Sequence, residues 1–172
     1  MIRARGSMRH SKPFVVLCLA ASFGLAGAAQ GPGFSKKQWQ ALYDKGTECL
    51  NRKVYDKIAA YFAPNWKHYT PAGKVDETGN DPARLENQFA GMKTILVHFD
   101  VLSSEKKGAA ILVHTHFIFS LWTQPRHDHK SHHVLNVGLA DDTWSKTNGR
   151  WLMSATRTLT EKPTMDGKPG SW

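Results

Sequence analysis

The sequence is poor in cysteine and has no apolar run long enough to cross a membrane. It contains two cysteines, Cys18 and Cys49. Its most apolar stretch, Phe14–Leu25, is shorter than the about 20 residues that a transmembrane helix requires. These absences argue against a disulfide-stapled scaffold and against a membrane-spanning protein. The chain must therefore be held together by its own apolar core, and 172 residues are enough to form one.

The beginning of the chain has the three regions of an export signal. A basic lead precedes the apolar stretch, and Ala26-Gly27-Ala28 follows it with the small residues that favour cleavage. We predict that residues 1–29 are a cleaved signal peptide. The mature protein would then be periplasmic or secreted, would keep no stable membrane anchor, and would have Cys49 as its single thiol.

Basic residues outnumber acidic ones, but they do not form a stripe suited to nucleic acid. The formal charge is +9 for the full chain and falls to +5 when the basic residues of the signal are removed. Many of the remaining ones occur as short pairs such as Lys36-Lys37 and Lys106-Lys107. A charge of this size favours solubility, and we expect no nucleic-acid partner. Residues 30–172 have the length of one domain.

The mature chain begins with helical periodicity. Ser35 followed by Gln38 is a capping box, which predicts the start of a helix. Apolar residues then recur at three- and four-residue spacing with a break near Asn51, and Pro64 is predicted to end the run. A second helix is predicted from Asp81-Pro82, because aspartate caps helices and proline favours the first turn.

The rest of the chain has the properties of strands. A short strand is predicted at residues 65–70, with a turn and a returning strand at 74–77. Longer strands are predicted at residues 94–102, 109–122, 131–146 and 150–160. Helices that precede several antiparallel strands indicate an α+β domain, with the helices packed over one face of the sheet.

The last two strands give the most specific tertiary prediction. Asn148-Gly149 is a strong signal for a two-residue hairpin turn, which would place Trp144 opposite Met153. Because side chains alternate across a sheet, five of them would then share one face. They are Asp142, Trp144, Trp151, Met153 and Arg157. Asp142 and Arg157 would be diagonal neighbours, either as a structural ion pair or as a ligand-binding pair.

Three sequence features together resemble those of one known superfamily. A long amphipathic helix runs into YFAPNWKHYTPAGKV at residues 61–75, a short helix precedes the long strands, and the chain closes with DTWSKTNGRW and a TEKPTMDGK tail. This pattern resembles the nuclear transport factor two-like superfamily, which includes SnoaL-like cyclases and ketosteroid isomerase. The closing segment is similar to exported members of unknown function. The resemblance implies a cone, with a curved antiparallel sheet closed by N-terminal helices as in the cystatin-like α+β barrel, often dimeric and with a pocket inside.

The resemblance also implies where a general base should lie, and this sequence departs from it. In ketosteroid isomerase the base is a carboxylate just before the Pro-x-Gly turn, where this chain has Thr70. A threonine hydroxyl is not a usable base near neutral pH. Tyr43 is the candidate for the first-helix tyrosine that polarises the substrate.

The base could instead be a histidine or another carboxylate. His68 is predicted to share the strand face of Thr70, and imidazole, with an ordinary pKa of about 6.5, suits proton transfer near neutral pH. The alternative for His68 is a half-buried ring that only makes hydrogen bonds. Asp100 shares a face with His98, and such a pair can transfer protons. His68 and Asp100 are therefore the catalytic candidates.

Several histidines raise the question of a metal site. His114 and His116 point to the same side of one strand, and more histidines surround the loop that follows. They are His127, His129, His132 and His133. Histidines in a polar loop are more often solvated than metal-bound, although zinc and copper accept imidazole ligands. We predict neither a metal nor a cofactor.

A larger set of residues is expected to line the pocket and bind a ligand. They are Tyr43, Trp66, Thr70, His114, His116, Asp142, Trp144, Trp151 and Arg157. The indoles of the last hairpin would offer flat apolar walls. The expected ligand is therefore small and apolar or ring-shaped.

Three functions remain open at this point. The leading hypothesis is an exported domain that binds a small, largely apolar molecule without established catalysis. The alternative is a cofactor-free isomerase, dehydratase or cyclase, in which His68 or Asp100 moves a proton while Tyr43 or Arg157 stabilises an oxyanion. The third is a structural or partner-docking protein, which forms a homodimer through an apolar outer face of the strand at 109–122.

Overall fold

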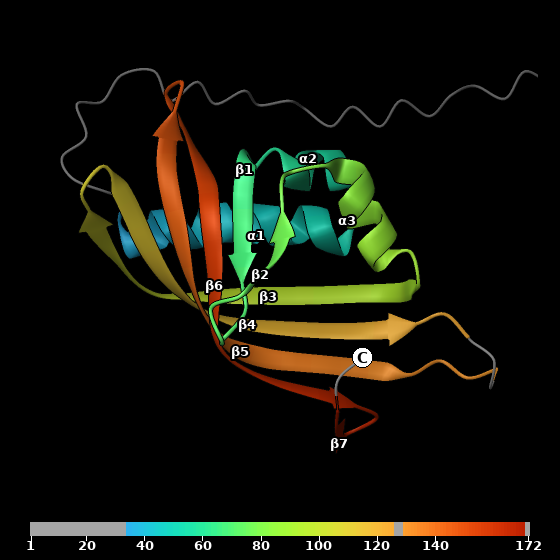
Figure 1. Ribbon diagram of the computed structural model, residues 1–172. Helices are drawn as coiled ribbons and strands as arrows, with labels where there is room; N and C mark the ends of the chain where they lie inside the picture. The colour runs from blue at the N-terminus through green and yellow to red at the C-terminus, as the bar shows by residue number, and fades with distance from the viewer. Residues whose placement is uncertain (1–33, 126–128, 171–172) are drawn as a thin grey trace, which may run out of the picture. The chain divides into compact units, whose positions relative to one another are not determined.

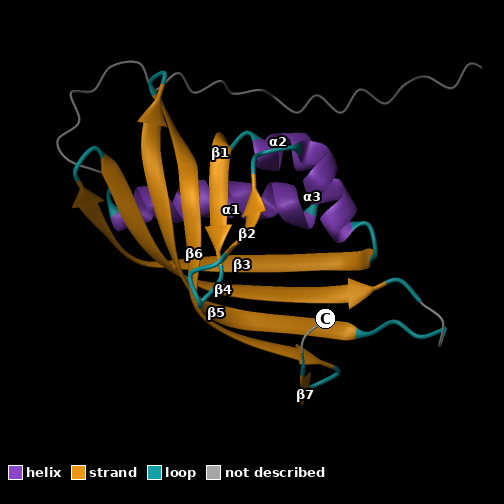
Figure 2. Cartoon of the chain, viewed as in Figure 1, coloured by secondary structure: helices purple, strands orange, loops and turns teal. Residues whose placement is uncertain are grey.

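The computed structural model describes residues 34–125 and 129–170, in which three helices lie against one face of a seven-stranded sheet (Figures 1 and 2). The predicted signal peptide lies outside the described residues. The helices are α1 (Lys36–Asn51), α2 (Tyr55–Ala59) and α3 (Pro82–Phe89). The strands are β1 (Phe62–Tyr69), β2 (Val75–Thr78), β3 (Met92–Lys107), β4 (Ala110–Thr123), β5 (His133–Thr147), β6 (Arg150–Met165) and β7 (Lys168–Pro169). None of the helices among the described residues is long and apolar enough to cross a membrane.

The sheet is mixed and open. Its strand order is β2-β1-β6-β5-β4-β3, with β7 paired to β6. The predicted α+β class with a curved sheet and helices on one face is confirmed. The sheet nevertheless differs from a closed antiparallel barrel, because β1 runs parallel to β6 and the two end strands, β2 and β3, do not pair with each other.

Bulges and one glycine accompany the bend of the long strands, which Figure 1 shows in β3, β4 and β5. β6 carries an extra residue at Ser154 and another at Leu159, and β3 carries one at Leu102. A bulge bends a strand and increases its local twist. Next to the second bulge of β6, a Cβ on Gly138 would lie 2.0 Å from a backbone oxygen of β6 and 2.6 Å from Phe117 Cζ. Glycine is therefore required where the Phe117 ring crosses β5.

α1 begins where the sequence predicted and covers one edge of the sheet. The Ser35 amide donates to Gln38 Oε1 at 2.8 Å, and the Gln38 amide donates to Ser35 Oγ at 3.3 Å, which completes the capping box. From the same helix, Gln40 and Asn51 hydrogen-bond backbone groups of β3. These bonds satisfy groups that an edge strand would otherwise offer to another chain.

α2 and α3 cover another part of the same face. Asp81 caps α3 and Pro82 occupies its first turn, as the sequence predicted. The prediction that Pro64 ends the first helical run is wrong, because the helix ends earlier and Pro64 lies within β1. Proline is tolerated there because the pairing of β1 with β6 is interrupted between Phe62 and Lys67.

The apolar core forms two clusters on the concave face. One lies against α2 and α3 and includes Phe89 and Val97, and the other lies against α1 and includes Trp39 and Trp144. The Trp39 and Trp144 rings are buried, with centroids 5.3 Å apart. Burial of such large rings is a main source of stability for a domain without a disulfide.

The apolar side of β4 belongs to this core. Its odd-numbered residues from Ile111 to Leu121 are mostly buried, and several of them line the interior. The sequence interpretation used this row of apolar residues to support a homodimer through the outer face of the sheet. Because the row points to the concave side, it gives no support to that dimer, which stays a prediction.

Candidate functional site

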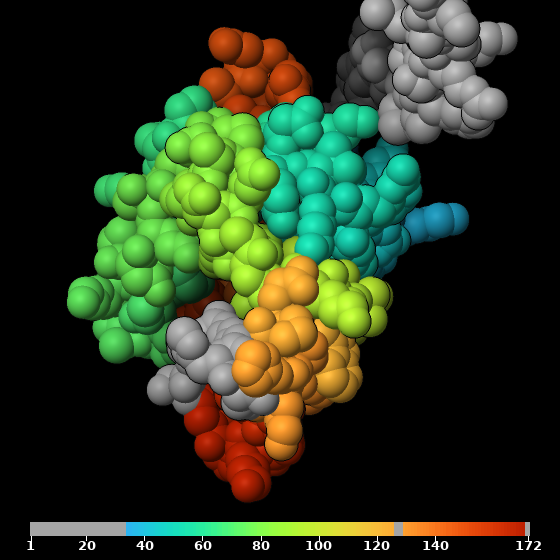
Figure 3. Space-filling model, turned by 90° about the vertical axis from the view of Figure 1, so that its right-hand side faces the viewer, coloured from blue at the N-terminus to red at the C-terminus, as the bar shows by residue number. Residues whose placement is uncertain are grey.

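A pocket lies between the helices and the concave face of the sheet. Its volume is about 350 Å³, which is in the range of small-molecule sites. In Figure 3 the surface is hollowed below α3, and atoms with the red-brown colour of β6 are visible inside. Most of the lining is aromatic or aliphatic. These residues include Leu42, Leu50, Ile58, Tyr61, Phe62, Leu85, Phe89, Phe99, Phe117, Phe119, Leu121, Ala140 and Met153.

The buried end of the pocket holds a carboxyl group and a phenol. Tyr43 Oη donates to Asp142 Oδ2 at 2.6 Å, and Trp144 Nε1 donates to Tyr43 Oη at 3.0 Å. Thr115 Oγ1 also donates to Asp142 Oδ2, at 3.4 Å. Asp142 lies on β5 and is 2% exposed, while Tyr43 comes from α1. The packing of α1 on the sheet therefore assembles this cluster from distant parts of the chain.

Burial moves both groups toward their neutral forms. It raises the pKa of Asp142 to about 6, although the hydrogen bonds from Tyr43, Thr156 and Thr115 act in the opposite direction. Burial, followed by the negative charge of Asp142, raises the pKa of Tyr43 well above its ordinary value. Tyr43 is thus a neutral donor at physiological pH, and Asp142 changes its protonation state in the mildly acidic range.

A second polar group borders the pocket from β1. His68 Nδ1 lies 2.6 Å from Asp76 Oδ1 on β2, and His68 Nε2 lies 2.9 Å from Thr158 Oγ1 on β6. An ionised carboxylate only accepts hydrogen bonds, so Asp76 favours the tautomer with its proton on Nδ1. Nε2 is then the acceptor, beside a threonine of the pocket wall. The ring is also stacked on Trp66, at 6.2 Å between centroids.

Strand pairing brings these two groups to the same level of the sheet. His68 is paired with Thr156, and Thr156 is paired with Asp142, across β1, β6 and β5. Because adjacent strands are about 4.8 Å apart, the backbones of His68 and Asp142 are separated by roughly 10 Å. All three side chains line the pocket. A small molecule that lies over Thr156 can therefore contact both the imidazole and the carboxyl group.

The exposed end of the pocket is rich in hydrogen-bond acceptors. Gln88 and Glu161 are its exposed lining residues. Glu77 accepts from Arg84 Nη1 at 2.6 Å and from Gln88 Nε2 at 3.0 Å. Glu161 Oε2 accepts from Asn136 Nδ2 at 3.0 Å. This end, which we name the mouth, consists of Glu77, Gln88, Asn136 and Glu161.

The structure brings together one group of the predicted site residues. Those that line the pocket are Tyr43, Trp66, His68, Asp142 and Trp144. They come from α1, β1 and β5, so the fold places near one cavity residues that are far apart in the sequence. Their roles in catalysis or binding stay predictions.

The prediction that Asp142 and Arg157 share a face is wrong. The hairpin turn and its first pairs are as predicted, but the bulge at Ser154 shifts the later residues of β6 by one position. Asp142 is opposite Thr156, and Arg157 is paired with Asp141 on the convex face. A shift of one residue moves a whole strand segment to the other side of a sheet. Arg157 lies in a separate hollow on that side.

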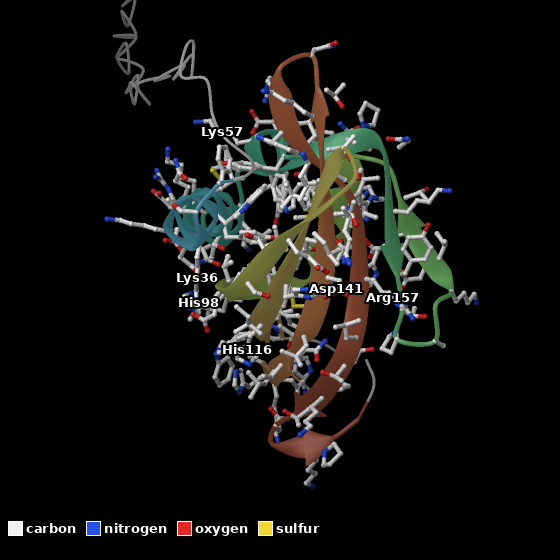
Figure 4. The ribbon with its side chains drawn as sticks, turned by 90° about the vertical axis from the view of Figure 1, so that its left-hand side faces the viewer. Lys36, Lys57, His98, His116, Asp141 and Arg157 are labelled. Carbon is white, nitrogen blue, oxygen red and sulfur yellow. The ribbon has the colours of Figure 1, made fainter. Side chains whose placement is uncertain are left out.

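Other predicted residues also lie on the convex face. His98 Nε2 is 2.9 Å from Asp100 Oδ1, and His116 Nδ1 is 3.4 Å from Asp100 Oδ2. His114 Nδ1 is 2.5 Å from Asp141 Oδ1. Figure 4 shows His98 and His116 near each other, with Asp141 on a neighbouring strand. None of these residues lines the concave pocket. The geometry therefore separates Asp100, His114 and His116 from a ligand bound there.

Thr70 and Trp151 are the remaining predicted residues, and neither lines the pocket. Thr70 follows β1, where its hydroxyl accepts from the Lys74 amide at 3.2 Å within the turn. Trp151 packs on Trp39, with centroids 6.0 Å apart, near the tip of the last hairpin. Thr70 therefore stabilises a turn and Trp151 contributes to the core.

The sequence did not indicate Asp76, Thr158 or Glu161 as site residues. Asp76 lies in the short returning strand that was predicted, but it is an extra residue there, and simple pairing of the two strands would have placed Glu77 opposite His68. Thr158 faces the pocket because of the bulge at Ser154, which carries no clear sequence signal. The second bulge, at Leu159, reverses that shift, so Glu161 lies on the face that alternation from Met153 gives, but it falls beyond the predicted end of the strand at residue 160.

The described residues contain no group of three or more histidine, cysteine or acidic side chains that could hold a metal ion. Of the histidines near the loop after β4, His127 lies outside the described residues. His133 Nε2 is 2.8 Å from Ser120 Oγ, and His132 Nδ1 is 2.6 Å from Asp166 Oδ2. The His133 ring is also stacked on Trp122, with centroids 4.8 Å apart.

No family model and no curated protein sequence matches the chain at a significant level. Solved structures do match. A putative scytalone dehydratase from Novosphingobium aromaticivorans has a TM-score of 0.57 at 14% identity, over 76% of this chain and 83% of that protein. A domain of unknown function with a cystatin-like fold from Nostoc punctiforme has a TM-score of 0.53 at 15% identity, over 71% and 74%. A hexachlorocyclohexane dehydrochlorinase has a TM-score of 0.56 at 10% identity, over 74% and 88%.

At these identities the matches establish the fold and not the activity. They agree with the curved sheet and the covering helices of this chain. The described residues therefore form a domain of the nuclear transport factor two-like, cystatin-like fold.

Proposed function

We propose that this domain binds a small, largely apolar molecule in the concave pocket. The observation that carries the proposal is a cavity of about 350 Å³ with mostly aromatic and aliphatic walls. A few polar groups, among them Asp142 and His68, also line it. Apolar pockets with a small number of convergent polar groups are typical ligand sites. With the predicted export signal, the proposed place of action is the periplasm or the exterior of the cell.

Filling the cavity tests this proposal. Ala140 on β5 is buried and lines the pocket, while Ala155 on β6 lies on the convex face. We expect naphthylmethanol to bind the wild-type protein in calorimetry. Ala140→Leu should weaken binding by about tenfold or more, and Ala155→Leu should leave it unchanged, with circular dichroism confirming that both variants fold. Equal binding by the two variants, or none by the wild type, would contradict the proposal.

A second candidate function is cofactor-free proton transfer, and the geometry of His68 favours it. Its Nε2 borders the pocket, and Asp76 at Nδ1 can stabilise the imidazolium that forms when Nε2 takes a proton. At the same level, Tyr43 donates its single hydroxyl proton to Asp142, and Asp142, when it is protonated, can donate a hydrogen bond to developing negative charge. Two of the matching structures are described as a dehydratase and a dehydrochlorinase, which agrees with elimination as the reaction type.

Nitrobenzisoxazole provides a test of the base. Removal of its ring C–H proton breaks the N–O bond and releases a coloured nitrophenolate, so no oxidant or cofactor is needed. We expect the wild-type protein to accelerate this reaction. His68→Gln should lower the rate by roughly 100-fold, which is the low end of the rate enhancement that a general base typically provides. Asp76→Asn should cause a smaller loss. His116→Gln on the convex face is the control, and an equal effect of the two glutamine variants would contradict the assignment.

A further inference from the structure

The mouth of the pocket contains an acceptor that has no donor. Asn136 Oδ1 is buried and has no hydrogen-bond partner among the described residues. Asn136 lies on β5 opposite Phe119 of β4, and both line the pocket. A buried acceptor without a partner is uncommon in native structures. Because Oδ1 has almost no exposed surface, a ligand N–H or O–H group supplies the missing donor when the Asn136 side chain turns toward the pocket.

The neighbour of Asn136 determines which amide atom is free. Glu161 accepts from Asn136 at 3.0 Å. Because an ionised carboxylate has no proton to give, the amide must turn Nδ2 toward it, which leaves Oδ1 as the unpaired atom. The free acceptor therefore lies next to a carboxylate, and the two can bind one donor group together.

The charges at the mouth favour a cation. No lysine or arginine lines the pocket in the described part of the chain. Glu77 is neutralised by Arg84, at 2.6 Å. Glu161, by contrast, hydrogen-bonds the neutral amide of Asn136 and forms no ion pair with another described residue. Arg157, which the sequence suggested as a ligand-binding partner of Asp142, is on the opposite face of the sheet.

We infer that the mouth binds the ammonium end of a small apolar amine. One N–H group of the ammonium donates to the Glu161 carboxylate, and another donates to Asn136 Oδ1. The bond to Glu161 joins two opposite charges and is therefore strong. The bond to Asn136 satisfies a buried acceptor that otherwise has no donor. The apolar body of the ligand then lies along Phe119 and Phe117, toward His68. An alcohol would satisfy Asn136 without the charge, and a carboxylate would be repelled by Glu161. This inference rests on the proposed binding function and names its ligand class.

Three probes with the same ring test the inference. They are naphthylmethylamine, naphthylmethanol and naphthoate, compared by calorimetry at neutral pH. We expect the amine to bind about tenfold more tightly than the alcohol and naphthoate to bind most weakly. Because Glu161 is exposed, the advantage of the amine should shrink at high salt. A naphthoate affinity equal to or above that of the amine would overturn the inference.

A matched pair of variants locates the effect. Glu161→Gln should remove the tenfold advantage of the amine and leave the alcohol within about twofold of its wild-type affinity. Glu105→Gln, which removes a carboxylate from β3 outside the pocket, should change neither. If the alcohol binds and the amine binds no better, the amine class is wrong while the pocket stands. If neither binds, the proposed function falls as well.

Discussion

Both faces of the sheet carry histidine–aspartate pairs, but among the described residues the pair formed by His68 differs in its surroundings. The contact between His68 and Asp76 is 2.6 Å and that between His98 and Asp100 is 2.9 Å. The His68 side chain is 24% exposed and borders the concave pocket, whereas that of His98 is 55% exposed on the convex face. An imidazole beside a carboxylate is therefore not a site by itself. It also needs an enclosed volume in which a reacting atom can be held.

The first way to sharpen this comparison is to remove one large side chain from each face. Trp144 is 2% exposed at the buried end of the pocket, while Leu96 is 55% exposed on the convex side of β3. We expect Trp144→Ala to lower the free energy of unfolding by about 3–5 kcal/mol. Leu96→Ala should change it by about 0.5 kcal/mol or less. Urea denaturation measures both, and similar losses would show that the two faces do not differ as described.

A smaller effect is expected from the buried carboxyl group. Burial raises the pKa of Asp142 from 3.8 to about 6. Between these pH values the folded protein keeps a proton that the unfolded chain releases, so stability falls as pH rises through this window. This difference between the two pKa values corresponds to at most about 3 kcal/mol of stability. Asp142→Asn, which still accepts from Tyr43, should be more stable than wild type above pH 6 by up to this amount.

The advantage of Asp142→Asn should disappear below about pH 4, where the carboxyl group is protonated in both the folded and the unfolded states. Urea denaturation of wild type and variant at the two pH values measures the difference. A stability difference that is the same at both pH values would mean that the burial of a charge is not its cause.

The smallest effect is expected on the convex face. The hydrogen bond from His98 lowers the pKa of Asp100, so its contribution to stability is present above the ordinary pKa and is lost as pH falls through the lowered value. Both side chains are more than half exposed, and solvent screens the pair. We expect His98→Gln to change the free energy of unfolding by about 0.5 kcal/mol or less. A loss several times larger in urea denaturation would show that this pair is structurally important.

Local structure was predictable where short-range chemistry determines it. Ser35 with Gln38, Asp81 with Pro82, and Asn148 with Gly149 begin helices or form a turn through contacts between near neighbours. These signals, together with the strand pattern, gave the α+β class and most of the strands. The resemblance to known proteins added the curvature and the interior pocket.

The candidate site was predictable only in part. Tyr43, His68 and Asp142 were identified, because their strands or helices follow regular periodicity up to these positions. The later part of β6 was assigned to the wrong face, since the extra residue at Ser154 depends on tertiary packing and not on local preference. For this reason Thr156 and Thr158 face the pocket where Arg157 was expected.

The most direct test of the concave pocket is a titration with naphthylmethanol observed on the six tryptophan indoles in a nitrogen–proton correlation spectrum. Trp66 and Trp144 line the pocket, and Trp122 is 42% exposed outside it. The indole signals of Trp66 and Trp144 should move with increasing ligand while that of Trp122 stays in place. Movement of the Trp122 signal with no change at Trp66 and Trp144 would contradict the account.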